Sequence, residues 1–131
     1  MFDAKFGYTR TLEGLSYDDA LARIPEVLKA EGFGVLTEID VKETMKKKLD
    51  VDFRRYKILG ACNPSLAHQA LSADPLIGLL LPCNVIVFED AGGTVVSFTN
   101  PRELFSLVDD PRLAPIAEQV DQKLKRALEA L

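Results

Sequence analysis

Alternating apolar and polar residues predict five β-strands in this chain. The pattern is clearest around Gly92-Gly93, where two runs rich in valine and phenylalanine flank a short turn typical of a β-hairpin. Three further runs rich in aromatic and β-branched residues have the composition of strands. The predicted strands cover residues 2–11, 33–39, 53–61, 84–89 and 94–99.

Apolar residues spaced three and four positions apart predict helices between the strands and after the last one. Each predicted start has a side chain that can accept a hydrogen bond from the first helical turn. These starts are Ser16, Asp40, Asn63 and Asn100, and proline follows both asparagines, where it suits the first helical position. Gly32 is predicted to end the first helix. The last helix carries an apolar stripe over residues 113–131, and Pro111 and Pro115 compete for its first turn.

The order of these elements predicts an α+β fold with two layers in a single domain, residues 1–131. The hairpin requires an antiparallel arrangement for at least part of the sheet. We therefore expect a mainly antiparallel sheet with helices on one face. The other face must be solvated or covered by a partner.

The charge of the chain makes nucleic acid an unexpected partner. The formal net charge is −4, whereas phosphate binding needs a positive surface. A basic cluster does run from Lys42 to Lys57, but Glu43, Asp50 and Asp52 interrupt it. This interleaving is typical of a solvated surface, so we expect no specific nucleic-acid binding.

Nothing in the sequence predicts a membrane partner or a secreted protein. The most apolar stretch, residues 76–88, contains Gly78, Pro82 and Asn84 and is too short to span a bilayer. The first residues lack a basic segment followed by an apolar one. With only two cysteines and no secretion signal, we expect a cytoplasmic protein whose two thiols are free.

The candidate chemistry gathers around two Cys-Asn pairs, Cys62-Asn63 and Cys83-Asn84, which contain both cysteines of the chain. If Asn63 caps a helix, the Cys62 thiol lies beside a positive helix end that favours thiolate. Cys62 should then be the more reactive cysteine. The alternative is that both cysteines are small buried apolar residues. The asparagines have the same two interpretations, because Asn63 and Asn84 can either bond to the backbone or line a pocket.

His68, the only histidine, follows Cys62 by six residues and adds a possible third ligand. Cys62, His68 and Cys83 contain the donor atoms of a zinc or iron site. Their spacing is not that of a zinc finger, and a histidine beside an apolar stripe is more often hydrogen-bonded structure. We therefore predict no metal site, and the sequence names no cofactor.

Three segments together resemble one family. They are residues 32–42 (GFGVLTEIDVK), 58–64 (ILGACNP) and 78–85 (GLLLPCNV), and the resemblance extends over nearly the whole chain. The chain resembles the domain of unknown function 302 family. This resemblance implies a β-α-β(4)-α core similar to the TATA-binding-protein class of folds, and it implies a homodimer. It implies no DNA binding and no activity, because a shared fold does not fix a function.

These observations favour a small homodimeric domain that binds a small molecule near Cys62, Asn63, His68, Cys83 and Asn84. The alternative is a thiol- or metal-dependent enzyme that uses the same residues, although no acid pair or nucleophile motif at a recognisable spacing supports it. The dimer would form through the uncovered face of the sheet. The apolar strand residues available for such a face are Phe2, Phe6, Tyr8, Val96 and Phe98.

Overall fold

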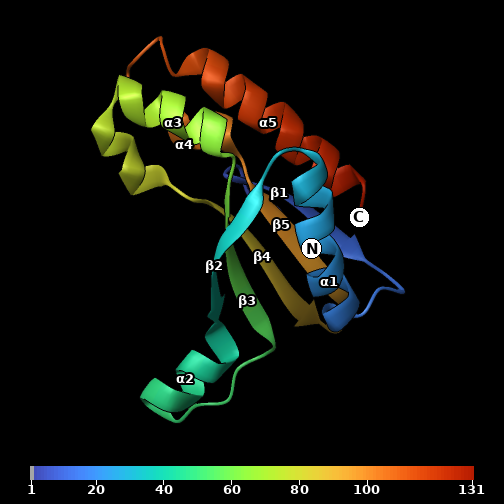
Figure 1. Ribbon diagram of the computed structural model, residues 1–131. Coiled ribbons are helices and arrows are strands. Elements are labelled where there is room, and N and C mark those ends of the chain that lie inside the picture. Colours follow the sequence, from blue (N-terminus) through green and yellow to red (C-terminus); the bar gives the residue numbers. More distant parts are fainter. Residues whose placement is uncertain (1) are drawn as a thin grey trace.

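The predicted strands form one antiparallel sheet in the computed structural model, which describes residues 2–131 (Figure 1). Across the sheet the order is β1-β5-β4-β3-β2, so the last strand in the sequence lies beside the first. Strands β4 and β5 form the predicted hairpin. The bounds are β1 Gly7–Leu12, β2 Gly34–Asp40, β3 Tyr56–Cys62, β4 Cys83–Asp90 and β5 Gly93–Thr99.

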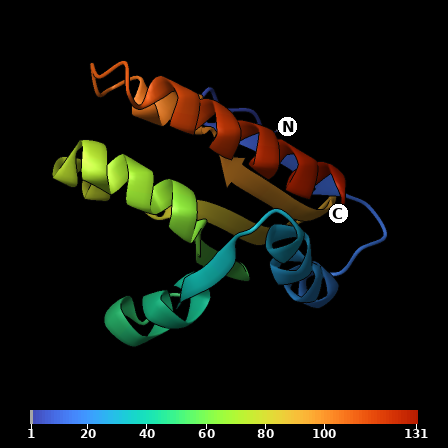
Figure 2. The ribbon, with the colours of Figure 1, turned by 45° about the horizontal axis from the view of Figure 1, so that its top comes forward.

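Two long helices, α1 (Tyr17–Ala30) and α5 (Ala114–Glu129), lie on the same face of the sheet (Figures 1 and 2). The other helices are α2 (Val41–Leu49), α3 (Pro64–Ala73), α4 (Pro101–Phe105) and the 3₁₀ helix η1 (Pro75–Leu80). The predicted α+β fold, with a mainly antiparallel sheet and helices on one face, is confirmed. Among residues 2–131, no helix is both long enough and apolar enough to cross a membrane.

All four predicted helix starts are confirmed, and each cap accepts a hydrogen bond from a backbone N–H in the first turn. The donor–acceptor distances are 3.0 Å for Ser16, 2.9 Å for Asp40, 3.2 Å for Asn63 and 3.1 Å for Asn100. Gly32 follows α1 with a φ of +83°, which glycine adopts without strain. Of the two prolines near the start of α5, Pro115 is the one in the first turn. No side chain caps this helix.

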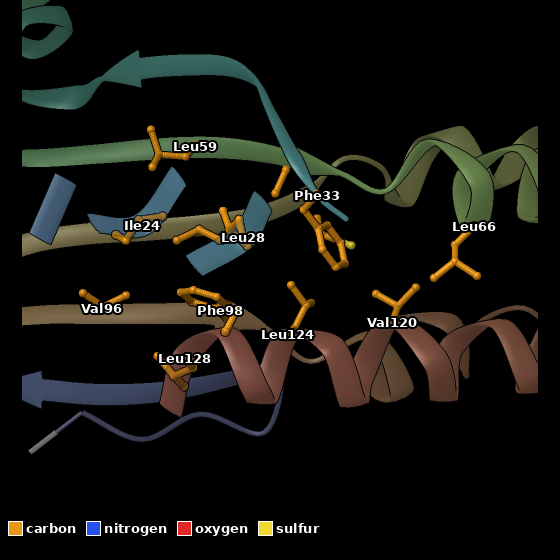
Figure 3. Packing of buried hydrophobic residues seen from close by; sticks show 14 of the residues in the cluster. Ile24, Leu28, Phe33, Leu59, Leu66, Val96, Phe98, Val120, Leu124 and Leu128 are labelled. Atoms are coloured by element: carbon orange, nitrogen blue, oxygen red, sulfur yellow. The ribbon is translucent and has the colours of Figure 1, made fainter. Parts of the chain in front are cut away.

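The core lies between the sheet and the two long helices (Figure 3). Ile24 and Leu28 of α1 and Leu124 of α5 are 0% exposed. They pack toward Val96 and Phe98 of β5, which are equally buried. Each fully buried side chain of this size contributes about 1.5–3 kcal/mol of hydrophobic stabilisation.

The structure differs from the sequence prediction at three places. β1 begins at Gly7, because Phe2 leaves the strand and packs edge-on against Phe88, with ring centroids 5.0 Å apart. β3 begins at Tyr56, and residues 53–55 belong to the preceding loop. The sequence also gave no sign of η1, whose first turn is capped by Asp74, which accepts a hydrogen bond from the backbone N–H of Leu76.

The prediction of which residues occupy the uncovered face was partly wrong. Tyr8 pairs with Phe98, and both side chains point to the face under the helices, where Val96 also lies. These three residues are therefore part of the core or pack against it. Phe2 and Phe6 are exposed, at 41% and 67%.

Candidate functional site

The predicted site residues fall into three separate places. Cys62, Asn63 and Cys83 line a crevice at one end of the sheet, between α3, α4 and α5. They meet there because β3 ends and β4 begins at the same end of the sheet, with Ala61 directly opposite Cys83. His68 is exposed on α3 and does not line the crevice. Asn84 is exposed on the other face of the sheet, in a different hollow.

The crevice is apolar and small. Phe33 from the loop before β2, Leu66 of α3 and Val120 of α5 point toward one another around it (Figure 3). Its free volume is about 20 Å³. A cavity needs roughly 10–15 Å³ to hold one water molecule, so the crevice has room for a group of about that size.

The two thiols of the crevice are free but differ in environment. Cys83 is buried, and burial together with the nearby Cys62 raises its pKa to about 12. Cys62 is partly exposed, and burial also raises its pKa. The prediction that the start of α3 would favour thiolate at Cys62 is therefore wrong in direction, because desolvation is the main influence.

The register also separates the two thiols. Ala61 is the residue opposite Cys83, so Cys62 is not the register partner of Cys83 and lies one residue further along, at the end of β3. This is not the arrangement of a cross-strand disulfide. Within residues 2–131, no group of three or more His, Cys, Asp or Glu side chains could hold a metal ion.

The uncovered face of the sheet carries an apolar row that sequence analysis missed. The register pairs Ile39 with Ile58, Ile58 with Ile86, and Ile86 with Ser97. Three isoleucines thus lie side by side across β2, β3 and β4. The row ends in two hydroxyls, since Ser97 hydrogen-bonds Thr9 of β1 at 2.8 Å. We call this set of five residues the isoleucine row.

An aromatic group lies beside the isoleucine row on the same face. Tyr56 and Phe88 are stacked with centroids 5.3 Å apart, and Phe53 approaches Tyr56 at 6.2 Å. Next to Asn84 and Ile86, the face is hollowed over about 360 Å³, with Phe6 and Tyr56 among the lining residues. The sequence signal for this surface was one isoleucine in each of three strands. The pairing of the strands was needed to show that these isoleucines lie on one face.

Helix α2 and the loop after it project from the end of the sheet that lies opposite to α3 (Figure 1). We call residues 41–53 the arm. No residue of α2 is buried. Leu49, Val51 and Phe53 are 66%, 44% and 40% exposed. The Lys42 ammonium donates to the carbonyl of Phe53 at 2.9 Å and closes the arm on itself.

A buried carboxylate under α5 was also missed. Asp121 is 0% exposed and accepts a hydrogen bond from the Tyr8 hydroxyl. Its other oxygen lies 3.2 Å from Arg102 Nε and 3.3 Å from Lys125 Nζ. Burial, then the hydrogen bond to Asp121, raises the pKa of Tyr8 to about 12. The cluster ties β1, α4 and α5 together.

Comparison with known proteins finds relatives of the same kind. A protein of Aquifex aeolicus (strain VF5), described as "Uncharacterized protein", is 27% identical over 128 residues, which are 95% of this chain and 83% of that protein. The crystal structure of an uncharacterized conserved protein DUF302 from Bacillus stearothermophilus superimposes with a TM-score of 0.88 at 34% identity. That match covers 96% of this chain and 98% of the other.

The family comparison agrees with the resemblance drawn from the three sequence segments. Residues 8–131 match the family described as "Domain of unknown function DUF302". The match includes every helix and all but the first residue of the sheet. This chain therefore belongs to the DUF302 family.

Proposed function

We propose that this chain is a non-enzymatic binding domain that works as a homodimer, and that its two copies meet through the uncovered face of the sheet. The isoleucine row is the observation that supports this proposal. An antiparallel sheet with one face in water normally places polar residues on that face. Here three isoleucines and an aromatic group occupy it instead.

Burial of this face by a second copy is the simplest way to remove it from water. A large apolar patch on one protein usually marks an interface, and two-fold symmetry is the commonest way to close one. The face is also nearly free of charged side chains at its centre, where Ile58 and Ile86 are only partly buried. An interface of standard size would remove about 800 Å² from each copy.

Sedimentation equilibrium over a dilution series tests the proposal. The wild type should have twice the chain mass of 14.5 kDa at micromolar concentration. Ile58→Lys places a charge in the centre of the isoleucine row and should give a monomer. Leu79→Lys is the matched control, because Leu79 is 85% exposed on η1 at the other end of the molecule. A wild type that stays monomeric would contradict the proposal.

We also propose that the crevice beside the cysteines takes a small apolar molecule. Its apolar lining favours this over a polar ligand, and its volume of about 20 Å³ limits the size. His68 would not contact the ligand, since it lies outside the lining. Xenon is a suitable probe for a dry apolar cavity. Dissolved xenon should shift the backbone amide resonances of Cys62 and Cys83 but not that of His68, and unchanged spectra would reject the site.

The enzyme hypothesis has less support than the binding hypothesis. Thiol catalysis requires thiolate, and burial raises the pKa of both Cys62 and Cys83.

The free state of both thiols is compatible with the reducing, cytoplasmic location that we propose.

A further inference from the structure

The arm has an apolar side that is only partly covered, since Leu49, Val51 and Phe53 remain 66%, 44% and 40% exposed. Helix α2 is nine residues long and has no buried residue. Isolated helices shorter than about 12–15 residues are marginal in water, and most helices in proteins depend on packing of an apolar face. The arm also encloses a hollow of about 370 Å³ between α2 and the following loop, lined in part by Lys46, Val51 and Phe53.

The apolar side of the arm is continuous with the proposed dimer face. Ile39, at the end of the isoleucine row, is followed at once by Asp40, the cap of α2. At the other end of the arm, Phe53 approaches Tyr56 of the aromatic group. A second copy that covers the isoleucine row would therefore come close to the arm as well.

Charge complementarity points to the same occupant. The arm has four lysines against Glu43, Asp50 and Asp52, a net charge of +1, which leaves −5 for the rest of a chain whose total is −4. Within the arm, Lys46 pairs with Asp50 and Asp52, and Lys47 pairs with Glu43; all of these ion pairs are exposed, and such pairs contribute little. All four lysines of the arm lie in α2, and this lysine-rich helix is attracted to the acidic remainder of a second copy of the same chain.

We propose that the arm is a clasp, which packs Leu49, Val51 and Phe53 of one copy against the second copy of this chain. The clasp rests on the proposed homodimer and adds to it a named contact and a salt dependence. Because exposed charges are screened by salt, the dimer should weaken as the salt concentration rises.

A triple variant tests the clasp without touching the core. The variant replaces three residues with serine: Leu49→Ser, Val51→Ser and Phe53→Ser. It should raise the dimer dissociation constant about 100-fold, because the apolar surface of three partly exposed side chains is no longer buried when the dimer forms. The matched control is Leu71→Ser, Leu76→Ser and Leu79→Ser, which changes three exposed leucines at the other end of the molecule and should leave the constant unchanged. Circular dichroism checks that both variants remain folded.

A second measurement does not depend on the stability of the variant. A spin label on Lys48→Cys, in a Cys62→Ser and Cys83→Ser background, is mixed with unlabelled ¹⁵N wild-type chain. The clasp predicts broadening of amide resonances on the uncovered face of the ¹⁵N chain. A wild type that is monomeric would contradict the homodimer and the clasp together. A dimer that the arm substitutions do not weaken, and whose amides are not broadened, would contradict the clasp alone.

Discussion

Adjacent residues of β4 show how differently the two faces of the sheet are buried. Val85 and Val87 point under α1 and α5 and are 0% exposed. Ile86, between them, points to the uncovered face and lies in the isoleucine row. The chain supplies enough helix to cover one apolar face and leaves the other, and this difference is the basis of the proposed homodimer.

The largest expected effect comes from isoleucine substitutions on the two faces. Ile24→Ala, on the buried side of α1, should lower the free energy of unfolding by about 2–5 kcal/mol. That loss should be the same at every protein concentration. Ile86→Ala should cost more as the concentration rises, because dimer formation stabilises the wild type by mass action. Chemical unfolding at several concentrations distinguishes the two faces, and a concentration-independent loss for Ile86→Ala would remove the difference between them.

Two tyrosines allow the two faces to be compared by removing a single hydroxyl group from each face. Tyr8→Phe removes the hydrogen bond to the buried Asp121, and a bond to a charged group contributes about 1.5–3 kcal/mol. Tyr56→Phe should cost less than about 0.5 kcal/mol, since the Tyr56 hydroxyl has no hydrogen-bond partner among residues 2–131. Urea unfolding measures both losses. Equal losses would show that the Asp121 cluster does not stabilise the fold.

The raised pKa of Tyr8 predicts that the fold loses stability at alkaline pH, by less than the substitutions above. The pKa is raised from 10.0 to about 12 in the folded chain, so the neutral phenol is favoured there. Its contribution is complete below pH 10 and is lost as the pH rises toward about 12. Thermal melts across this range should fall less steeply for Tyr8→Phe than for wild type. Tyr17, whose pKa burial also raises to about 12, accounts for part of the fall that remains.

The two cysteines give the test with the least effect on stability. In the Cys→Ser variants, Cys62 should react with iodoacetamide at least about tenfold faster than Cys83, which is buried and whose pKa is raised to about 12. The order of reactivity is the one expected from sequence, but the cause is exposure and not the end of α3. Equal rates in the folded protein would show that the crevice opens freely.

Local signals explain why so much of the fold could be predicted. The caps Ser16, Asp40, Asn63 and Asn100 act within three residues of themselves, so a short segment contains the whole signal. The hairpin of β4 and β5 is equally local. The three segments that resemble the family also lie within single strands, turns and caps.

The parts that could not be predicted depend on residues far apart in the sequence. Asp121 looks like a solvated position on α5, and only its contact with Tyr8, 113 residues earlier, identifies it as buried. The isoleucine row requires the register of three strand pairs. His68 and Asn84 stand next to the crevice motifs in sequence, yet helix and strand periodicity turn their side chains away from the crevice.

Contacts between isoleucine methyl groups of two copies test the central claim most directly. A mixture of ¹³C-labelled and unlabelled chains allows an isotope-filtered NOE spectrum that reports only contacts between copies. The homodimer predicts such NOEs for the isoleucines of the row and none for those buried within one chain. The row contains Ile39, Ile58 and Ile86, and the buried controls are Ile24, Ile77 and Ile116. An absence of intermolecular NOEs from the row, at a concentration where the wild type is dimeric, would contradict the claim that the copies meet through this face.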